Sequence, residues 1–349
     1  MRTSFYIPLC FLLASSLFGQ AILVKVVDDV TGSLVEGAEV TAIYDNPASP
    51  KRYDEQIKQT DEEGEVRFNG IGTLGASLRV NRNGYYGFGV TNAEHFRYSS
   101  KELKGGVEEI INLRPVIEPI ALYAKRTESK TYQSGRVPVP VVNDWCGYDL
   151  GMGDWVAPHG NGKVADFLLR FDREFVRFEK KRTPLDVRRK AIRGKYERLG
   201  KEFTEEVFKL EAGDWDIRLE IAFPGEKEGL IRVEDKFNPH SVLRMPHLAP
   251  EKGYAPDYTY SLKTYGESAW NQTDDVGFFL RTRVVLDEDG EIESANYAKV
   301  YGDFKIEQDG DLSFWYYFNP EVNDRNLEFD PDQNLFPEDT LGTSSFYLP

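Results

Sequence analysis

Aromatic side chains in stretches rich in glycine and proline are candidates for ligand binding in this sequence. Such stretches form loops, where an exposed ring can stack on the apolar face of a sugar. The set comprises Trp145, Tyr148, Trp155, Tyr254, Tyr258, Tyr260, Tyr265 and Trp270. The candidate ligand-binding residues that we take from it are Trp145, Tyr148, Trp155, Tyr258 and Trp270. The competing interpretation, which the pattern favours, is core packing, because aromatic rings also fill the interior of β-sandwiches.

Oxygen-bearing side chains alternate near the end of the sequence, as they do in a calcium-binding loop. Asp330, Asp332 and Asn334 occupy every second position, and Glu338 follows. Calcium prefers carboxylate and amide oxygens, but its common loop also needs a glycine at the sixth position and a glutamate at the twelfth. Both are missing here. A solvated acidic loop is therefore the better prediction, with a calcium site as the alternative.

The histidines do not form a recognisable metal motif. His240 and His247 lie among prolines and could join His159 or Cys146 only if distant loops converge. The spacing is irregular, and no pair of ligands is set at a fixed interval as in zinc sites. We expect isolated loop histidines, and we predict no cofactor.

Catalytic motifs are absent from the sequence. The segment at residues 160–163 (GNGK) lacks the spacing and the Ser or Thr of a phosphate-binding loop. No G-x-S-x-G occurs, and no zinc-peptidase motif is present. A glycosidase pair stays open among the 58 carboxylates, because such a pair is defined by its separation in space. The chain is thus expected to be non-enzymatic, with a polysaccharide hydrolase as the alternative.

Composition and charge exclude several classes. The 349 residues are enough for two domains, and 40% hydrophobic residues exclude global disorder. There are 43 Lys and Arg against 58 Asp and Glu, a net charge of −15. Phosphate polymers and anionic membranes should be repelled by such a chain. We therefore expect no nucleic-acid partner.

Residues 1–21 have the pattern of a secretory signal. A basic start at Arg2 precedes an apolar run at residues 5–18, and small residues follow at 19–21. The run is shorter than the roughly 20 residues of a membrane span, and Pro8 interrupts it. A lipoprotein cysteine at Cys10 is the weaker alternative. The expectation is a secreted or periplasmic protein whose mature chain has no transmembrane anchor.

Cleavage after residue 21 would leave Cys146 as the single cysteine. An internal disulfide is then impossible. The simplest prediction for Cys146 is a small buried apolar residue, and the alternative is a bond to another chain.

The first module, residues 22–114, reads as short strands. Residues 22–28 (ILVKVVD) and 38–44 (AEVTAIY) alternate with a period of two, which places every second side chain on an interior face. Residues 22, 24 and 26 and then 40, 42 and 44 are the predicted interior positions. Turn signals at 60–64 and 83–84 separate further strands. Strands at this spacing predict a β-sandwich.

The segments VVDDVTGSLVEGAEVTAIY and QTDEEGEVRFNGI are similar to the carboxypeptidase regulatory-like domain. The matching positions are Asp28, Thr31, Gly32, Val35, Gly37, Ala38, Val40, Thr60, Asp61, Gly64, Phe68, Gly84 and Tyr85. The resemblance implies a transthyretin-like or immunoglobulin-like sandwich that serves as a folding or docking unit and carries no catalytic residue. An insertion at residues 46–56 departs from the family and puts the pairing of the second hairpin in question.

Four prolines mark residues 115–143 as an extended linker. The segment 119–126 (PIALYAKR) begins with apolar residues and could instead pack against one of the modules.

Residues 144–349 form the second, larger β-rich module. Residues 276–286, 292–306 and 312–318 predict a three-stranded antiparallel meander whose corners are Asp-Gly turns. Residues 164–178 predict a long strand, and residues 216–223 and 231–237 predict another pair. The segments GYDLGMGDWVAPHGNGKVADF and NPEVNDRNLEFDPDQNLF resemble a module of uncharacterised secreted bacterial proteins, which implies no activity.

One stretch, near residues 185–210, departs from the strand pattern. Its apolar residues recur at helical spacing, whereas Gly194 and Gly200 disfavour a helix interior. A short helix and a twisted hairpin are equal alternatives.

The sequence thus predicts an all-β chain of two antiparallel β-sandwich modules, with that one short helix as the possible exception. The functional hypothesis is a secreted or periplasmic binding or structural protein. Its first module would dock, and its second would recognise a cell-envelope protein or a polysaccharide.

Overall fold

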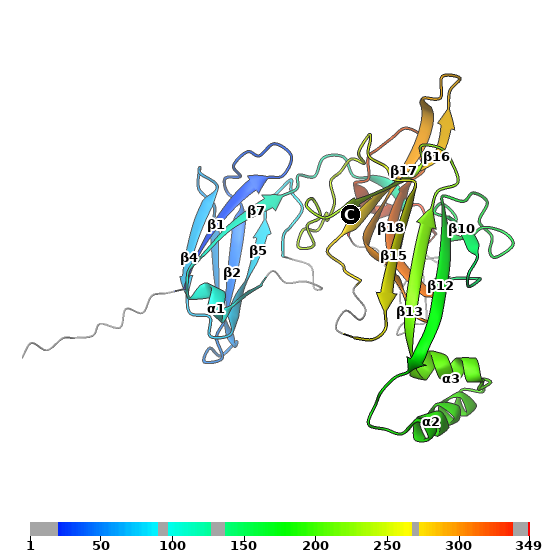
Figure 1. The fold of residues 1–349 in the computed structure, drawn as a ribbon. Helices are drawn as coiled ribbons and strands as arrows, with labels where there is room; N and C mark the ends of the chain where they lie inside the picture. Colours follow the sequence, from blue (N-terminus) through cyan, green and yellow to red (C-terminus); the bar gives the residue numbers. More distant parts are fainter. Residues whose placement is uncertain (1–19, 90–96, 127–136, 267–271, 338–347) are drawn as a thin grey trace, which may run out of the picture. The chain divides into compact units, whose positions relative to one another are not determined.

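The computed structural model describes residues 20–89, 97–126, 137–266, 272–337 and 348–349 (Figure 1). The chain is mostly β-strand, with three helices in the described part, so the all-β prediction holds in its main outline. Two compact units divide between Pro115 and Val116. Residues 1–19 of the predicted signal lie outside the described residues, and Gln20 opens the first strand. Among the described residues, no helix has the length and apolarity to cross a membrane.

Unit 1 contains two sheets. The first has the order β4 (Glu65–Gly70), β1 (Gln20–Asp28) and β7 (Val107–Leu113). The second has the order β3 (Tyr53–Gln59), β2 (Glu39–Asp45), β5 (Gly75–Asn81) and β6 (Arg97–Ser99). The short helix α1 (Ser100–Leu103) follows β6. Strands β1 and β7 run parallel, unlike the purely antiparallel arrangement expected, and the other sheet supplies the long connection that a parallel pair needs.

Alternating residues of both sheets meet in one core. The predicted interior positions are all fully buried there: Ile22, Val24, Val26, Val40, Ala42 and Tyr44. The period of two is therefore confirmed for these strands. The insertion at residues 46–56 leaves the β2–β3 hairpin intact, since the pairing runs from Asp45–Tyr53 to Glu39–Gln59.

Turns of unit 1 use the residues that carry the family resemblance. The Asp28 carboxylate accepts hydrogen bonds from the backbone N–H groups of Val30 and Thr31. The Thr60 hydroxyl accepts from the Ala38 N–H and donates to the Val35 carbonyl. At Gly64, φ is +67° and an added Cβ would lie 2.8 Å from a backbone oxygen. Local turn chemistry thus accounts for these positions.

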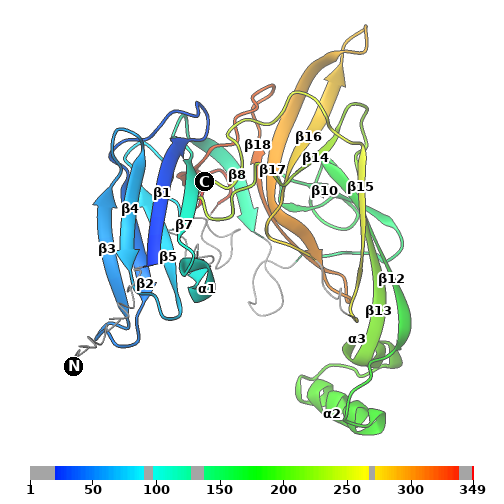
Figure 2. The ribbon, with the colours of Figure 1, turned by 60° about the vertical axis from the view of Figure 1, so that its left-hand side comes forward.

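Unit 2 contains two larger sheets, seen in Figures 1 and 2. The five-stranded sheet is antiparallel and has the order β11 (Asp154–Trp155), β10 (Trp145–Asp149), β12 (Phe167–Phe178), β13 (Gly213–Ala222) and β15 (Asp257–Lys263). The seven-stranded sheet has the order β14 (Gly229–Val233), β16 (Gly277–Leu286), β17 (Ile292–Ile306), β18 (Asp311–Asn319), β8 (Ile120–Arg126) and β19 (Phe329–Asn334), with β9 (Val137–Pro138) also on β18. Strand β8 falls within the range expected as a linker.

The predicted meander is confirmed. Strand β17 pairs with β16 on one side and with β18 on the other, both antiparallel. Gly290 and Gly310 have φ of +75° and +91° at the two corners, which only glycine adopts without strain.

The pair expected from residues 216–223 and 231–237 does not form. Strand β13 lies between β12 and β15, whereas β14 joins β16 in the other sheet. The chain crosses between the sheets after Pro224. The Glu228 carboxylate fixes this crossing, because it accepts hydrogen bonds from Gly225 N–H and from Val284 N–H of β16.

Two helices, rather than one helix or a hairpin of strands, occupy the ambiguous stretch. Helix α2 (Leu185–Arg198) and helix α3 (Glu205–Ala212) connect β12 to β13 and project from one end of these strands (Figure 2). Gly194 is tolerated inside α2 because it faces open space. Gly200, with φ of +63°, terminates the helix, and the Thr204 hydroxyl caps the next one.

Two hydrophobic clusters organise unit 2. The first draws on both sheets and includes Phe171 and Leu219 from one, and Phe278 and Val300 from the other. The second lies on the opposite face of the seven-stranded sheet, where Met245 and other residues outside the strands cover it. The five-stranded sheet has no such cover among the described residues.

Candidate functional site

The outer face of the five-stranded sheet is polar and open to solvent. Along β12 and β13 the buried residues belong to the core, and the residues between them point outward. The outward residues of β12, β13 and β15 are Leu168, Arg170, Asp172, Glu174, Asp216, Arg218, Glu220, Ala222, Asp257, Thr259, Ser261 and Lys263. Ion-forming side chains dominate this face, which we call the charged face.

Strand register sorts the charged face into rows. One row holds Arg170, Glu220 and Thr259, and β10 extends it with Trp145 opposite Arg170. The next rows are Asp172–Arg218–Ser261 and Glu174–Asp216–Lys263. Side chains directly opposite each other on neighbouring strands lie within contact range. Each row therefore brings hydrogen-bond donors and acceptors together.

Four of the eight charged side chains of this face form ion pairs with one another. Arg170 Nε lies 3.3 Å from an Asp172 carboxylate oxygen, and Arg170 Nη1 lies 3.7 Å from Glu220 Oε2. Arg218 binds the other oxygen of Glu220. The Tyr265 hydroxyl donates to Asp216 Oδ1 at 2.9 Å. Pairing holds these long side chains in place, although exposed pairs contribute little to stability.

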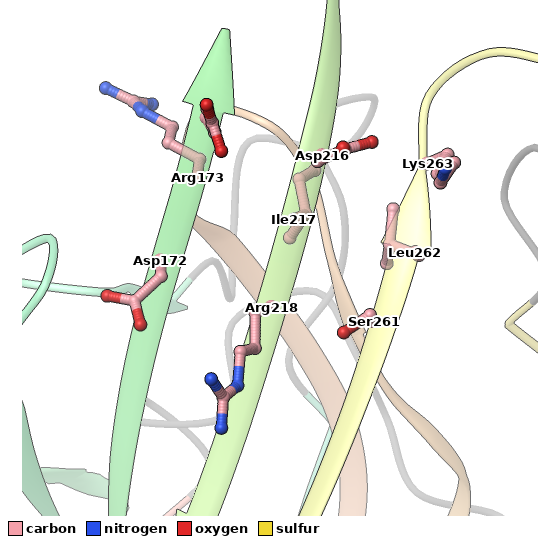
Figure 3. A pocket seen from close by; sticks show the side chains of 9 residues that line it. Asp172, Arg173, Asp216, Ile217, Arg218, Ser261, Leu262 and Lys263 are labelled. Atoms are coloured by element: carbon pink, nitrogen blue, oxygen red, sulfur yellow. The ribbon is translucent and has the colours of Figure 1, made fainter. Parts of the chain in front are cut away.

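A shallow hollow of about 420 Å³ lies over the last two rows. Figure 3 shows Asp172, Arg218 and Ser261 across three adjacent strands, with Asp216 and Lys263 further along. The volume falls within the range of small-ligand sites. Its lining offers guanidinium and ammonium donors beside carboxylate and hydroxyl acceptors. Such a surface suits a ligand that both donates and accepts hydrogen bonds.

Trp145 is one of the predicted ligand-binding aromatic residues, and it reaches this face. It is 41% exposed, whereas the next residue, Cys146, is 1% exposed and lies in the core. The ring therefore stands on the solvent side of β10, in the same row as Arg170. An exposed tryptophan beside polar side chains is a combination that can stack on a sugar ring.

Tyr148 and Trp155 pack in the core instead. They are 0% and 4% exposed, and their rings meet edge to face at 5.3 Å. The Trp155 Nε1–H donates to the Pro138 carbonyl at 3.0 Å. Neither ring presents a face to a ligand, so these two assignments are corrected to packing. Sequence could not separate them from Trp145, because their side of the strand depends on register.

Tyr258 is half-buried and turned toward the core. Its ring lies 5.2 Å from Phe278 and 5.8 Å from Tyr260. Burial raises the pKa of its hydroxyl, and the nearby charge of Asp303 adds to this. Trp270 falls outside the described residues.

Cys146 is free and buried, as predicted for a small apolar residue. Burial raises the pKa of its thiol, with a smaller contribution from the charge of Asp144. The thiolate is thus disfavoured, and reactivity at neutral pH is low.

The predicted calcium ligands use their oxygens within the chain. Asp330 accepts from the Asp332 N–H and from the Gln333 amide. The Asn334 side chain bonds both the N–H and the carbonyl of Ala124 and thereby ties β19 to β8. The alternative to a calcium site, a solvated acidic segment, therefore fits these residues better. They form strand β19 and not the loop that we expected.

The histidines remain apart. His159 is exposed and His240 half-buried, whereas His247 is buried with Nε2 4.0 Å from Glu328 Oε2. Across the described ranges, no three His, Cys, Asp or Glu residues are grouped so that they could hold a metal ion.

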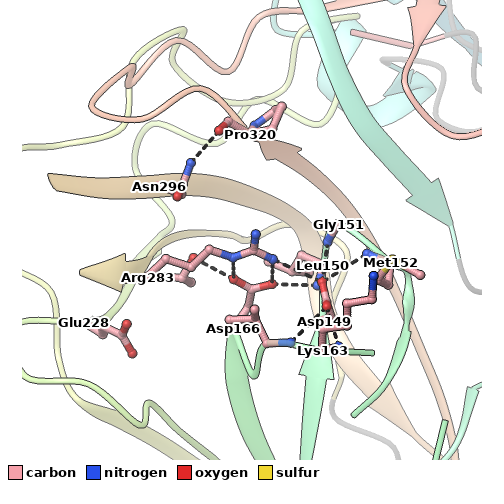
Figure 4. A network of polar contacts seen from close by, with 12 residues as sticks. Asp149, Leu150, Gly151, Met152, Lys163, Asp166, Glu228, Arg283, Asn296 and Pro320 are labelled. Carbon is pink, nitrogen blue, oxygen red and sulfur yellow. Dashed lines mark hydrogen bonds and ion pairs between the residues drawn. The ribbon is translucent and has the colours of Figure 1, made fainter. Parts of the chain in front are cut away.

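A buried polar network fixes the loop that follows β10 (Figure 4). The Arg283 guanidinium binds both oxygens of Asp166, at 2.8 and 2.9 Å, and Asp149 Oδ1 at 3.1 Å. Burial alone would raise the pKa of Asp149. Backbone hydrogen bonds from Lys163, Val164 and Met152, together with the Arg283 charge, outweigh burial and hold that pKa below its usual value. With its hydrogen bonds made inside the protein, the network is structural.

Sequence analysis missed the paired residues of the charged face. A signal existed: the run DWDIRLEIAF alternates apolar and charged residues, which predicts one solvent-facing side. The partners across the strands could not be predicted, because they depend on which strands are neighbours and in which register.

Comparisons with known proteins leave the family open. No protein family and no curated protein matches the sequence. A dioxygenase structure, Tetur07g02040, is 19% identical over 22% of this chain and 49% of its own, with a TM-score of 0.16. The Bacillus anthracis TIE protein is 20% identical over 39% of this chain and 24% of its own, with a TM-score of 0.21. A putative carbohydrate binding protein from Bacteroides uniformis is 9% identical over 87% and 98%, with a TM-score of 0.17.

The chain thus spans less than half the length of the first two of these structures. TM-scores this low carry no argument about fold or function.

Proposed function

We propose that this chain is an extracytoplasmic, non-enzymatic binding protein that recognises a polysaccharide through its charged face. The observation that carries the proposal is the exposed ring of Trp145 in register with Arg170, at the margin of an uncovered row of donors and acceptors. Aromatic stacking supplies apolar contact, and the neighbouring polar groups supply direction.

The pairing of charges favours a sugar over a small ion. Arg170 and Arg218 already have carboxylate partners, so a simple anion would have to compete with Asp172 and Glu220. A hydroxyl can instead donate to a carboxylate and accept from a guanidinium without breaking the pair. A chain of sugar rings carries many hydroxyls along its length, which suits rows repeated across three strands.

In this proposal the two units divide the work. Each unit is a two-layer β-sandwich, with the sheets of each sharing one core. Unit 1, with its resemblance to carboxypeptidase regulatory-like domains, docks to a cell-envelope component. Unit 2 recognises the polysaccharide, and the predicted signal at residues 1–21 directs both to the outside of the cytoplasm.

The test is a glycan array probed with the purified chain, followed by an assay for new reducing ends. We expect binding without cleavage. Trp145→Ala should weaken it about tenfold, the equivalent of roughly 1.4 kcal/mol for a lost stacking contact. The matched control is Tyr53→Ala, an exposed ring on β3 in unit 1 that is 37% exposed.

Other outcomes separate the alternatives. New reducing ends would favour the hydrolase and direct attention to the carboxylates of the charged face. Glycan binding that is unchanged in both Trp145→Ala and Arg218→Ala would show that the charged face is not the binding site. Binding to no glycan would contradict the proposal and favour a protein partner or a structural role.

A further inference from the structure

The helical hairpin between β12 and β13 concentrates positive charge in an acidic chain. Residues 177–201 hold eleven Lys and Arg against three Asp and Glu, whereas the whole chain has a net charge of −15. Most of these residues belong to α2 or to the segment that leads into it. Total charge therefore conceals a local basic surface, which a count along the sequence would have found.

Several of these cations are exposed and form no ion pair with any described residue. They are Lys180, Arg182, Lys190, Arg193, Arg198 and Lys201. Arg193 lies over the Phe203 ring, and Arg198 donates to the Gly194 carbonyl in its own helix. We call this set the basic surface of the hairpin.

Acidic residues of α3 form ion pairs with cations of α2. Arg189 Nη2 binds Glu205 at 3.0 Å, and Lys195 binds Glu211 at 2.8 Å. Glutamates of α3 thus pair two cations of α2, while the basic surface stays unneutralised. The two helices are held as a hairpin partly by these pairs.

The hairpin is also fixed to the sheet. Phe208 of α3 is fully buried and lies 5.0 Å from the ring of Phe178 at the end of β12. Arg188 donates to the carbonyls of Glu179 and Ala212, which lie at the two junctions with the strands. The basic surface is therefore presented by a supported element.

We propose that the basic surface docks a polyanionic polysaccharide, one bearing carboxylate, sulfate or phosphate groups. Charge complementarity carries the inference, because six uncompensated cations gather on one projecting hairpin of an acidic protein. The choice of a polysaccharide rests on the proposed function, since a polymer could contact both surfaces. The charged face of the sheet would bind the sugar rings of the polymer, and the basic surface of the hairpin would bind its anionic groups.

Two other polyanions fit less well. A membrane-binding helix needs its apolar residues on one face, but α2 buries none, and its exposed Val187 is followed by Arg188, Arg189 and Lys190. A nucleic-acid duplex carries dense charge on all sides, which the acidic remainder of the chain would repel.

The experiment measures affinity for dextran sulfate, with uncharged dextran as the matched probe. The variant Lys180→Glu/Lys190→Glu/Lys201→Glu should lose at least about tenfold in affinity, because three favourable contacts become repulsive. The control, Lys51→Glu/Lys101→Glu/Lys104→Glu, makes the same change of net charge at exposed positions of unit 1 and should bind as the parent does. Circular dichroism and the melting temperature verify folding, and Lys190→Ala/Lys201→Ala provides a milder second variant.

Equal losses in the two triple variants would overturn the inference, since net charge alone would then explain binding. Tighter binding to phosphatidylglycerol vesicles or to duplex DNA than to dextran sulfate would overturn the choice of partner. Trp145→Ala should weaken neutral-glycan binding more than dextran sulfate binding, because the charged groups of dextran sulfate also bind the hairpin. A parent chain that binds dextran sulfate but no neutral glycan would refute the proposed function and leave the inference about the hairpin standing. A parent chain that binds neutral glycans but not dextran sulfate would refute the inference about the hairpin alone.

Discussion

The two sheets of unit 2 share one core but differ on their outer faces. The inner faces of both contribute to the same cluster, with Leu219 on one side and Phe278 on the other. The outer face of the seven-stranded sheet carries a second cluster that includes Tyr317 and lies under Met245. The outer face of the five-stranded sheet carries charges, some of them paired, and the residues that the structure describes form no second cluster there. A sheet face that no other element covers is available for a ligand. Its polar side chains make contact with water favourable, so the face needs no cover.

The strand sequences reflect this difference. Strand β13 alternates buried and less buried positions, as expected with one face in solvent. Strand β17 is buried continuously over much of its length, because both of its faces are covered. Alternation along β13 therefore marks a face that is open to solvent.

The largest effect should come from the buried network beside the two sheets. Asp166 is 0% exposed and accepts hydrogen bonds from Thr282 and Arg283 of β16. We expect Asp166→Ala to lower the unfolding free energy of unit 2 by about 3–5 kcal/mol, because Arg283 loses its bidentate partner and keeps only Asp149, and the buried Thr282 hydroxyl loses its acceptor. Urea denaturation followed by tryptophan fluorescence measures it, since all five tryptophans lie in unit 2.

Asp172→Ala on the charged face is the matched control for that change, with an expected cost within about 0.5 kcal/mol. Equal costs at the two aspartates would show that the contrast between network and open face is wrong.

Neighbouring residues of β13 test the two faces of a single strand. Leu219 is 0% exposed, and Leu219→Ala should cost about 2–5 kcal/mol through lost burial and a cavity. The Arg218 side chain is 55% exposed, so Arg218→Ala should cost no more than about 0.5 kcal/mol. The same urea titration reports both. A large cost at Arg218 would mean that its pairs have a structural role.

Acid should weaken the network through Asp149. The pKa of this carboxylate is lowered in the folded chain, so its stabilisation is complete above the unfolded value of 3.8 and is lost as the pH falls through the folded pKa. Asp149→Asn should destabilise unit 2 at neutral pH, and its difference from the parent should shrink below about pH 4. Urea midpoints across this pH range measure the trend. A difference that is constant with pH would remove the charge of Asp149 from the account.

The smallest effects concern the two glycines of the hairpin. Gly194→Ala should stabilise α2 by roughly 0.5–1 kcal/mol, since the site is helical and open. Gly200→Ala should destabilise the hairpin by about 1 kcal/mol or more, because φ there is +63°. Amide hydrogen exchange in α2 detects both changes. The same direction of change at both glycines would contradict the assigned ends of the helix.

Local patterns were predictable, and pairings over distance were not. Alternation in the sequence predicted the interior positions of Val40, Ala42 and Tyr44. The Asp-Gly turns at 289–290 and 309–310 predicted the meander. The failed pairing of β13 with β14 has a different origin, because adjacency in sequence does not decide which sheet a strand joins. Trp145 and Trp155 looked alike in sequence, and strand register separated them.

The charged face of unit 2 is the central claim, and hydroxyl-radical footprinting tests it most directly. The purified chain is oxidised with and without a saturating glycan from the array, and modified residues are located by mass spectrometry. The account predicts that oxidation of Trp145 and Tyr265 falls, while that of Tyr53 in unit 1 does not change. Protection confined to residues of the seven-stranded sheet or its cover, with Trp145 as reactive as before, would contradict it.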